Sequence, residues 1–346
     1  MKRRIFWTTA VVSFCFVAFA FLTPAMAEKP INLRMSSFVP PMHFMNSKIL
    51  QPWIDMIEER TKGKVKIKIY AGSALGKPQD QYDMAARGVA DITWGILAYT
   101  PGRFPLVTVM ELPFMSPNAD IGSRMAQRLY EKGVFGDEFK DVKMLALGMP
   151  PNMDLHTSKK LVKTLADLKG MKIRTPSAMM GKLIKKWGGV PVAMPAPEVY
   201  MSLERGVIDA IFLDPLTLMG IKCNEVTQYH TRVGISTTVF FFAMNRKVWD
   251  KLPPDIQKVI SELSGESLSA DMNGKIADRA VIRVYKKLKA SGDEIYTLPP
   301  AELAVWEKSA QPAFGEWVKA MEEKGLPGKK VLEEALQMKK ACSKKK

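Results

Sequence analysis

Cysteine and histidine are scarce in this chain, which has three residues of each type among 346. Three cysteines are too few for a disulfide-stapled miniprotein, and at roughly 150 residues per domain the length indicates about two domains. The histidines, His43, His156 and His230, are isolated, and Cys223 and His230 have no second pair of ligands at a metal-binding spacing. We therefore expect no metal and no other cofactor. Whether Cys223 and Cys342 form a disulfide stays open.

The sequence motifs of several enzyme classes are also absent. Segment 72–78 contains Gly76 and Lys77, but it has three residues between its glycines and a proline where a phosphate loop needs Ser or Thr. The patterns G-x-G-x-x-G and G-x-S-x-G do not occur. A hydrolase with two catalytic carboxylates stays open, because such pairs form only in three dimensions. Nothing in the sequence favours one, and we expect no enzyme.

Positive charge exceeds negative charge, with 51 Lys and Arg against 35 Asp and Glu and a net charge of +16. The basic residues are spread along the chain, and the only cluster is the short tail 344–346. This distribution, together with a predicted export signal, argues against nucleic-acid binding. A field that steers a small anionic ligand, or contact with an acidic membrane component, explains the charge better. A basic surface-adhesion protein is a weaker alternative.

The N-terminus has the pattern of a secretory signal peptide. Basic residues 2–4 precede an apolar run over 5–22, and Pro24 leads into the A-x-A cleavage pattern of 25–27. We predict cleavage before Glu28, which leaves a net charge of +13 because three basic residues and no acids are lost. No other stretch is apolar for eighteen residues, so the mature protein should not span a membrane.

The sequence disfavours two alternatives to cleavage. An uncleaved membrane anchor is disfavoured because Thr8, Thr9 and Ser13 interrupt the apolar run and no stop-transfer flank follows it. Lipidation at Cys15 is disfavoured because Phe14 stands where a lipoprotein signal has a small residue. Export with cleavage near Ala27 therefore remains the prediction.

Strand and helix patterns alternate along most of the chain, which predicts α/β architecture with largely parallel sheets. In the first unit we expect strands over 33–38, 65–69 and 91–94, and helices from 46 to 63 and over 79–87. In a second unit after Pro150 we expect a helical turn over 165–168, strands over 171–174, near 190 and over 208–213, and helices over 179–187 and 198–205.

A further apolar strand over 237–244 precedes a long helical region that runs from 254 to about 289. Gly265 and Gly274 are its expected kink points, and its length suggests that it passes from one unit to the other. Helices over 301–308, 313–323 and 330–339 close the chain. The predicted division is a signal peptide over 1–27, domain I over 28–151 plus 239–280, domain II over 152–238 plus 281–320, and a C-terminal helix and basic tail over 321–346.

One cation has a position that suggests a binding role. Arg174 ends the predicted strand 171–174, and ligands of parallel α/β sheets bind outside the carboxyl ends of the strands. A guanidinium there can hold a carboxylate through two parallel charge-assisted bonds. Position alone does not separate this role from pairing with a structural acid.

Several segments together resemble the DctP-type substrate-binding proteins of TRAP transporters. They occur in the family's order across essentially the whole mature chain: 88–92 (GVADI), 111–114 (ELPF), 165–176 (LADLKGMKIRTP), 191–200 (PVAMPAPEVY), 206–209 (GVID) and 252–260 (LPPDIQKVI). The resemblance implies a two-domain α/β periplasmic binding protein of the Venus-flytrap type, with two hinge strands and a long domain-spanning helix. It implies closure on a small organic acid that is delivered to TRAP membrane permease subunits. We expect a monomer.

In this family the arginine of the K-I-R-x-P segment, here Arg174, forms the main salt bridge to the ligand carboxylate. A second arginine that many relatives carry has no counterpart here, and Asp154 or a neighbour stands near its place. After the strand 91–94, where relatives carry polar side chains, this sequence has mainly apolar and aromatic residues. The segment after Asp209 is one residue longer than in relatives, so the placement of Asp214 in the site is open. The candidate ligand-binding residues are Phe38, Trp94, Ile96, Tyr99, Asp154, Arg174, Ser177 and Asp214.

Removing the partner of a buried charge costs about 3 to 5 kcal/mol, so Arg174 should require an anionic group on the ligand. Because there is only one such arginine, a monocarboxylate fits better than a dicarboxylate. Asp154 or Asp214 could meet an ammonium or hydroxyl group, and the aromatic residues could flank a ring. Each aromatic residue could equally well pack in the core without touching a ligand. Asp154 could equally well be a carboxylate on the protein surface. Binding of a C4-dicarboxylate and membership of an ATP-driven importer are the remaining alternatives.

Overall fold

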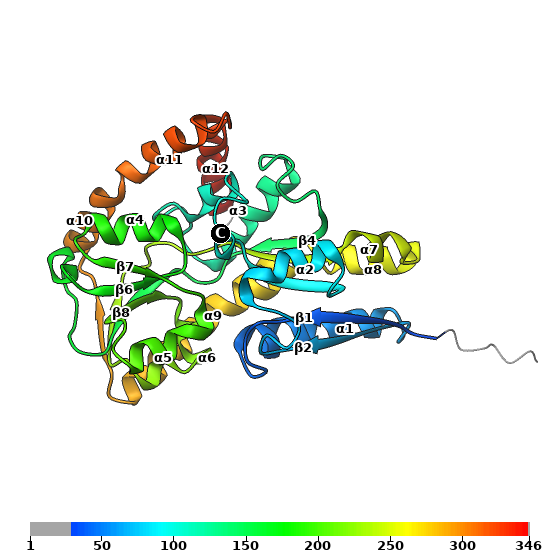
Figure 1. Ribbon diagram of the computed structural model, residues 1–346, viewed down its shortest axis with the longest axis horizontal. Coiled ribbons are helices and arrows are strands. Elements are labelled where there is room, and N and C mark those ends of the chain that lie inside the picture. Colours follow the sequence, from blue (N-terminus) through cyan, green and yellow to red (C-terminus); the bar gives the residue numbers. More distant parts are fainter. Residues whose placement is uncertain (1–28, 345–346) are drawn as a thin grey trace, which may run out of the picture.

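The computed structural model describes residues 29–344, which form two α/β lobes around two separate β-sheets (Figure 1). We call the part built on the five-stranded sheet lobe I and the part built on the six-stranded sheet lobe II. The predicted signal peptide lies outside the described residues. Among these residues, no helix is both long and apolar enough to cross a membrane.

The sheet of lobe I has the order β2-β1-β3-β10-β4, in which β1, β2 and β3 are parallel and β10 runs antiparallel to β3 and β4. Its strands are β1 (Ile31–Ser36), β2 (Val65–Tyr70), β3 (Ile92–Ile96), β4 (Val142–Gly148) and β10 (Phe240–Asn245). Its helices are the π-helix η1 (Met45–Leu50), α1 (Gln51–Arg60), α2 (Gln81–Arg87), α3 (Ala119–Glu131), α7 (Arg246–Lys251) and α8 (Pro254–Glu262). Short 3-10 turns add η2 (Pro78–Asp80), η3 (Leu97–Tyr99) and η4 (Val107–Glu111).

The sheet of lobe II has the order β11-β9-β5-β8-β6-β7, in which β8, β6 and β7 are parallel neighbours. Its strands are β5 (Asp154–Thr157), β6 (Lys172–Thr175), β7 (Val190–Ala193), β8 (Ala210–Leu213), β9 (Tyr229–Arg232) and β11 (Glu294–Thr297). Its helices are α4 (Ala178–Lys186), α5 (Val199–Glu204) and α6 (Pro215–Gly220), with 3-10 turns η5 (Leu165–Leu168), η6 (Ala196–Glu198) and η7 (Cys223–Glu225).

The chain passes between the lobes through two crossing segments, residues 149–153 and 233–239. The segments are hydrogen-bonded to each other, since Met153 N donates to Ser236 O at 2.7 Å and Ile235 N donates to Met153 O at 3.2 Å. A third passage runs through α9 (Lys275–Ala290), the gold diagonal helix in Figure 1. The lobes are therefore joined by paired extended segments at one place and by a helix at another.

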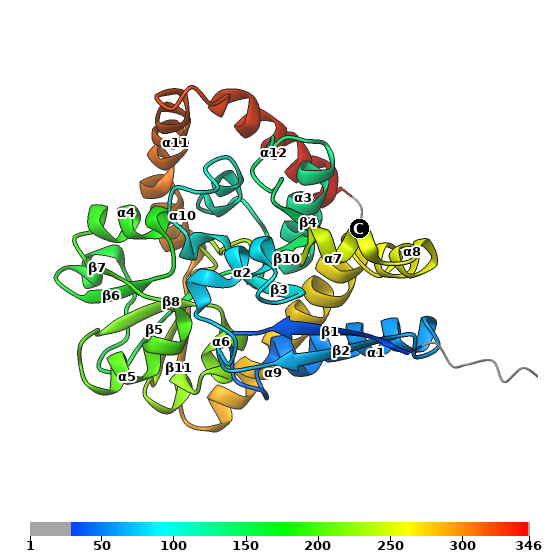
Figure 2. The ribbon, with the colours of Figure 1, turned by 45° about the vertical axis from the view of Figure 1, so that its right-hand side comes forward.

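The C-terminal helices α10 (Pro300–Ala310), α11 (Pro312–Glu322) and α12 (Gly328–Ser343) return from lobe II to lobe I (Figure 2). Trp187, the residue after α4, donates its indole N–H to Ser309 of α10 at 2.9 Å. Trp317 of α11 donates to the Thr108 hydroxyl of lobe I at 2.8 Å, and α12 packs on α3. These helices therefore cover both lobes.

The helical region that begins at Pro254 is divided, whereas the sequence predicted one kinked helix. Gly265 takes a left-handed φ of 58°, which ends the α8 segment instead of bending it, and its N–H donates to Leu145 O at 2.8 Å. The π-helix η8 (Ser267–Gly274) follows and continues directly into α9. Gly274 has helical dihedrals, and a Cβ atom there would lie 2.6 Å from Asp120 Cα of α3. Gly274 thus permits a close approach of two helices.

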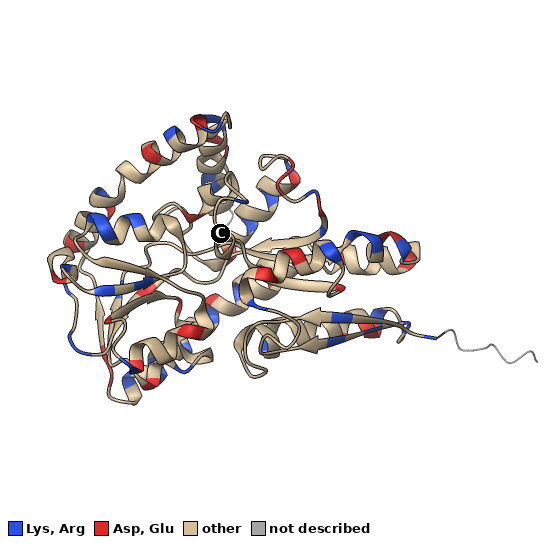
Figure 3. Ribbon diagram, in the orientation of Figure 1, with Lys and Arg blue, Asp and Glu red and all other residues tan. Residues whose placement is uncertain are grey.

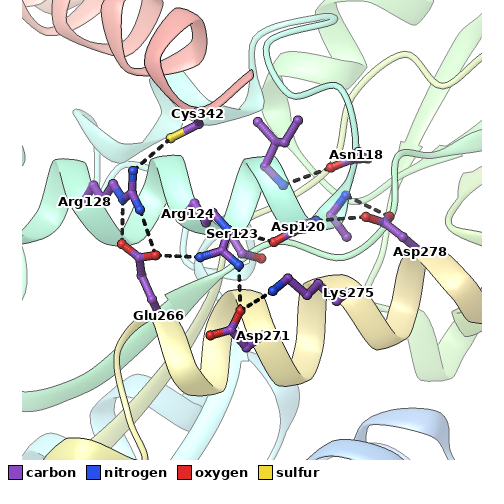
Figure 4. A network of polar contacts seen from close by, with 12 residues as sticks. Asn118, Asp120, Ser123, Arg124, Arg128, Glu266, Asp271, Lys275, Asp278 and Cys342 are labelled. Carbon is purple, nitrogen blue, oxygen red and sulfur yellow. Dashed lines mark hydrogen bonds and ion pairs between the residues drawn. The ribbon is translucent and has the colours of Figure 1, made fainter. Parts of the chain in front are cut away.

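Ion pairs fix this helical region to α3 (Figure 4). Arg124 Nη1 lies 2.7 Å from Glu266 Oε2 and Arg124 Nη2 lies 2.6 Å from Asp271 Oδ1, while Arg128 Nε lies 2.5 Å from Glu266 Oε1. The first two backbone N–H groups of α3 each donate to one carboxylate oxygen of Asp278, at 3.0 Å in both cases. The region does pass from lobe I to lobe II, as predicted, and this cluster anchors its lobe I end.

Several other predictions are confirmed or extended. Val65 and Ile67 of β2 are buried while Lys66 and Lys68 are exposed, as the alternation indicated. The sequence analysis did not identify α3, β4, β5, β9 or β11, of which three strands have only four residues each. Cys223 and Cys342 are buried free thiols, and Cys342 Sγ accepts from Arg128 Nη1 at 3.8 Å. Basic and acidic residues are interspersed over both lobes (Figure 3).

Candidate functional site

Arg174 lies at the carboxyl edge of the three parallel strands of lobe II, where the sequence placed it. Its Nε donates to Met194 O, just after β7, at 3.0 Å, and Nη1 donates to Phe212 O of β8 at 3.3 Å. Nη2 donates to the hydroxyl of Tyr99 in lobe I at 3.4 Å. A guanidinium carries five N–H donors, so these three bonds orient the group and leave donors for a further acceptor.

The Arg174 charge is buried without an ionic partner. Its side chain is 1% exposed, and no carboxylate within residues 29–344 lies within 4.0 Å of it. Carbonyl and hydroxyl oxygens satisfy hydrogen bonds but do not neutralise the charge. The buried carboxyl of Asp214 interacts with this charge electrostatically but forms no salt bridge with it, and a buried cation without a directly paired acid is unfavourable. The alternative of a structural salt bridge, which the sequence left open, is therefore not realised here.

A small cavity of about 30 Å³ lies beside this guanidinium, between the lobes. Lobe I contributes Ile96, Tyr99 and Phe240, and the crossing segments contribute Pro150, Met153, Thr237 and Thr238. The remaining walls come from lobe II: Arg174, Pro176, Ala196, Leu213, Asp214 and Thr217. Its volume suffices for one or two water molecules, whereas ligand pockets generally measure about 300–1,000 Å³. An organic acid can therefore enter only if the lobes separate.

Tyr99 connects the two lobes at this cavity. Its hydroxyl accepts the Ala196 N–H at 2.9 Å in addition to the Arg174 bond. Burial raises the pKa of this phenol, so it stays neutral. Both partners belong to lobe II, which makes Tyr99 a direct hydrogen-bonded link across the cleft.

Asp214 is the second charged group that lines the cavity. It caps α6, accepting the N–H groups of Leu216 at 3.1 Å and Thr217 at 3.0 Å through one oxygen. Burial raises the pKa of its carboxyl, while hydrogen bonds from Thr217 and the nearby Arg174 charge oppose that rise. Its second carboxylate oxygen accepts neither of these backbone bonds.

Phe38 and Trp94 lie one layer behind the cavity. Their ring centroids are 4.5 Å apart, and Phe38 also meets Tyr99 edge to face at 6.0 Å. Trp94 packs against Phe240 at 5.4 Å, and its indole N–H donates to Ser37. These two predicted residues support the cavity wall through Tyr99 and Phe240, but they do not line the cavity themselves.

The structure does not bring Asp154 or Ser177 to the cavity. Asp154 Oδ1 accepts the N–H groups of Val233 at 2.7 Å and Gly234 at 2.8 Å, and Oδ2 accepts the hydroxyl of Tyr285. Asp154 therefore pins a crossing segment to β5 and α9, and it lines a different cleft. Ser177 caps α4 by accepting from Met180 N at 3.3 Å and lines a groove that also contains Glu111.

Thr237 is a cavity residue that the sequence analysis missed. It lies on a crossing segment, is 2% exposed, and its hydroxyl makes no hydrogen bond to any described residue. Buried hydroxyl groups are normally hydrogen-bonded, so this one is poised for a ligand acceptor. The pair of threonines before the apolar strand was a visible but non-specific signal, since only the fold aims the crossing segment at Arg174.

Two α/β lobes joined by paired crossing segments, with a cavity between them, define a two-domain binding protein. The chain belongs to the bacterial extracellular solute-binding proteins of family 7 (DctP), whose family model matches residues 35–320.

A TRAP solute-binding protein of Rhodoferax ferrireducens, solved with copurified benzoate, is 32% identical, has a TM-score of 0.88 and covers 91% of this chain and 99% of its own. A marine metagenome TRAP solute-binding protein specific for aromatic acids, solved with metahydroxyphenylacetate, is also 32% identical, with a TM-score of 0.88 and coverage of 91% and 100%. The C4-dicarboxylate-binding periplasmic protein of Rhodobacter capsulatus is 26% identical over 91% of this chain and 94% of its own. These relatives are solute-binding receptors.

Proposed function

We propose that this protein is the periplasmic receptor of a TRAP transporter and captures a small monocarboxylate, with aromatic acids as the preferred class. The observation that carries the proposal is the Arg174 guanidinium, which is buried at the interlobe cavity and forms no salt bridge with any of residues 29–344. A bound carboxylate would neutralise that charge and use the donors that the protein leaves. Thr237 would add a hydrogen bond to the same ligand.

The cavity lining supports a single acidic group on an otherwise apolar ligand. Arg174 is the only cation among the lining residues that the structure describes, whereas a C4-dicarboxylate presents two anionic groups. Ile96, Met153 and Phe240 provide apolar walls, and Tyr99 provides an aromatic edge. The benzoate and metahydroxyphenylacetate of the two relatives have this chemistry. Asp214 would select ligands with a hydroxyl or ammonium group away from the carboxylate.

Capture requires a hinge motion. The cavity is too small for an organic acid in the present arrangement, and the crossing segments 149–153 and 233–239 are the points where two rigid lobes can rotate. The ligand would stabilise the closed arrangement through contacts to both lobes at once. The closed receptor would then meet the membrane permease as a monomer, after export and removal of residues 1–27.

A thermal-shift screen of the mature protein against small organic acids tests this function. A ligand at one hundred times its Kd adds about 2.7 kcal/mol of stability, so shifts should be confined to monocarboxylates such as benzoate. Arg174→Met should weaken binding by more than one hundredfold, because about 3 to 5 kcal/mol is lost with the charged partner. Arg232→Met is the matched control, since Arg232 is an exposed arginine of the same lobe.

Unchanged affinity in Arg174→Met would refute the assignment of the anchor. If no acid shifts the unfolding temperature, mass spectrometry of the supernatant after denaturation decides between a copurified ligand and a wrong function. The mass of the secreted protein checks the cleavage site, which should leave Glu28 as the first residue.

A further inference from the structure

A second contact between the lobes involves a histidine that the binding site does not use. His43 lies in the loop between β1 and η1 of lobe I, and its ring packs directly on Gly220 at the end of α6 in lobe II. A Cβ atom on Gly220 would lie 2.7 Å from His43 Nε2. The absence of a side chain at residue 220 therefore lets the imidazole fit between the lobes.

The surroundings of His43 accommodate only the neutral ring. Its side chain is 5% exposed, and Nδ1 accepts the Met45 N–H at 3.1 Å, so that nitrogen cannot carry a proton without losing the bond. Nε2 makes no hydrogen bond to any described residue, so an imidazolium would have no acceptor for either N–H group. Burial lowers the pKa of His43 to about 4.

The cleft around this contact carries basic residues. Residues on both sides of His43 and Gly220 itself line a cleft between the lobes, and its charged members are Lys48 from η1 and Arg283 and Lys287 from α9. Lys222 follows α6. No acidic residue lines the cleft within the described part of the chain. Among the described residues, this cleft therefore offers an imidazolium no carboxylate partner.

We propose that His43 is a proton-sensitive latch, in which the neutral ring against Gly220 is needed for closure and protonation opens the lobes and weakens ligand binding. This inference rests on the proposed receptor function, because the contact joins the lobes that must separate to admit a ligand. When the lobes separate, His43 becomes hydrated and its pKa returns toward the ordinary value of about 6.5. Closure therefore excludes a proton from this site in mildly acidic solution.

The experiment measures the Kd of benzoate by calorimetry between pH 5 and 8 for the wild type and for His43→Asn, which keeps an acceptor near the Nδ1 position but does not titrate. Taking the ratio of the two Kd values removes the contribution of other titrating groups, including Glu111. With the closed pKa about 4 and the open pKa about 6.5, the wild type should weaken relative to the variant by roughly thirtyfold from pH 8 to pH 5. A constant ratio would overturn the latch.

A second pair of variants tests the contact without titration. Gly220→Ala should weaken benzoate binding at every pH by at least tenfold, because the new methyl group holds the lobes apart, and adding His43→Ala should restore binding by making room. Gly315→Ala, at an exposed site with no atom within 4 Å of the added methyl group, is the control. If Gly220→Ala binds normally, or if the double variant is not rescued, the latch is wrong. If the wild type at pH 8 binds neither benzoate nor any other acid of the screen, and mass spectrometry finds no copurified ligand, the receptor function itself fails.

Discussion

Replacing Tyr99 with phenylalanine should weaken ligand binding without disturbing either lobe. The substitution removes one oxygen, which accepts the Ala196 N–H at 2.9 Å and a guanidinium N–H of Arg174 at 3.4 Å. Both donors belong to lobe II and Tyr99 belongs to lobe I, so these bonds exist only when the lobes are together. In the open form water can satisfy the Ala196 N–H, and the penalty therefore falls on the closed, ligand-bound form.

The size of the effect follows from the burial of these groups. Leaving a buried donor without an acceptor costs about 1–3 kcal/mol, and the 3.4 Å bond to Arg174 is too long to add much. The expected loss corresponds to a roughly 5- to 150-fold increase in Kd. The aromatic packing against Phe38 is kept, because the ring remains.

Calorimetric titration with benzoate, or with the acid that the screen selects, measures this loss. Tyr82→Phe is the matched control, since Tyr82 is 1% exposed but its hydroxyl donates to Glu138 O at 3.4 Å within lobe I. The control should change Kd by less than about threefold, because its bond is unaffected by lobe separation. A Tyr99→Phe protein that binds as tightly as the wild type would show that this link does not contribute to closure.

Three further substitutions test the framework around the site. Gly274→Ala should lower the free energy of unfolding by about 2 kcal/mol, because the new Cβ meets the α3 backbone at 2.6 Å. The control Gly315→Ala should raise the free energy of unfolding by roughly 0.5–1 kcal/mol. Equal urea midpoints for the two variants would contradict the close approach of the helices. Glu111 is 3% exposed, and burial raises its pKa to about 7. The folded protein therefore favours the protonated carboxyl. This contribution to stability is fully present below about pH 4.5 and is lost as the pH rises to 7. The advantage of Glu111→Gln over the wild type should grow by about 3 kcal/mol across that range, and a pH-independent difference would refute the assignment. Asp154→Asn should lower the free energy of unfolding by about 1–3 kcal/mol, because one oxygen no longer accepts a hydrogen bond from the crossing segment or from Tyr285. The Kd for benzoate should change less than threefold. A large loss of affinity would show that Asp154 does take part in ligand binding.

The order of strands and helices could be predicted where the signal is local. The alternation of Val65 and Ile67 with lysines defines β2, because a strand exposes every second residue. Arg174 was placed at a carboxyl edge because it ends the predicted strand 171–174, immediately before Thr175 and Pro176. The six motif segments were specific because they occurred together and in order, which is a property of the sequence alone.

Contacts between distant parts of the chain decided the rest. The carboxylate of Asp154 meets Tyr285, 131 residues away, and the Tyr99 hydroxyl meets Ala196, 97 residues away. No local pattern reports such pairs, so the sequence could not tell that one acid holds a crossing segment while another, Asp214, lines the cavity. Thr237 was not predicted for the same reason, because only its position in the cavity with Arg174 makes it a candidate ligand contact.

The sequence by itself indicated the class of protein through segments that resemble a known family, placed the candidate cationic anchor Arg174 at a strand end, and predicted an apolar ligand environment. These inferences depend on residue identity, periodicity and the order of the segments. The tertiary structure alone decided that the anchor has no carboxylate partner in the described chain, that Gly274 and Gly220 permit close approaches, and that Gly265 ends a helix. These features depend on which atoms of separate segments meet, and that is fixed only when the two lobes pack around their shared helix and crossing segments.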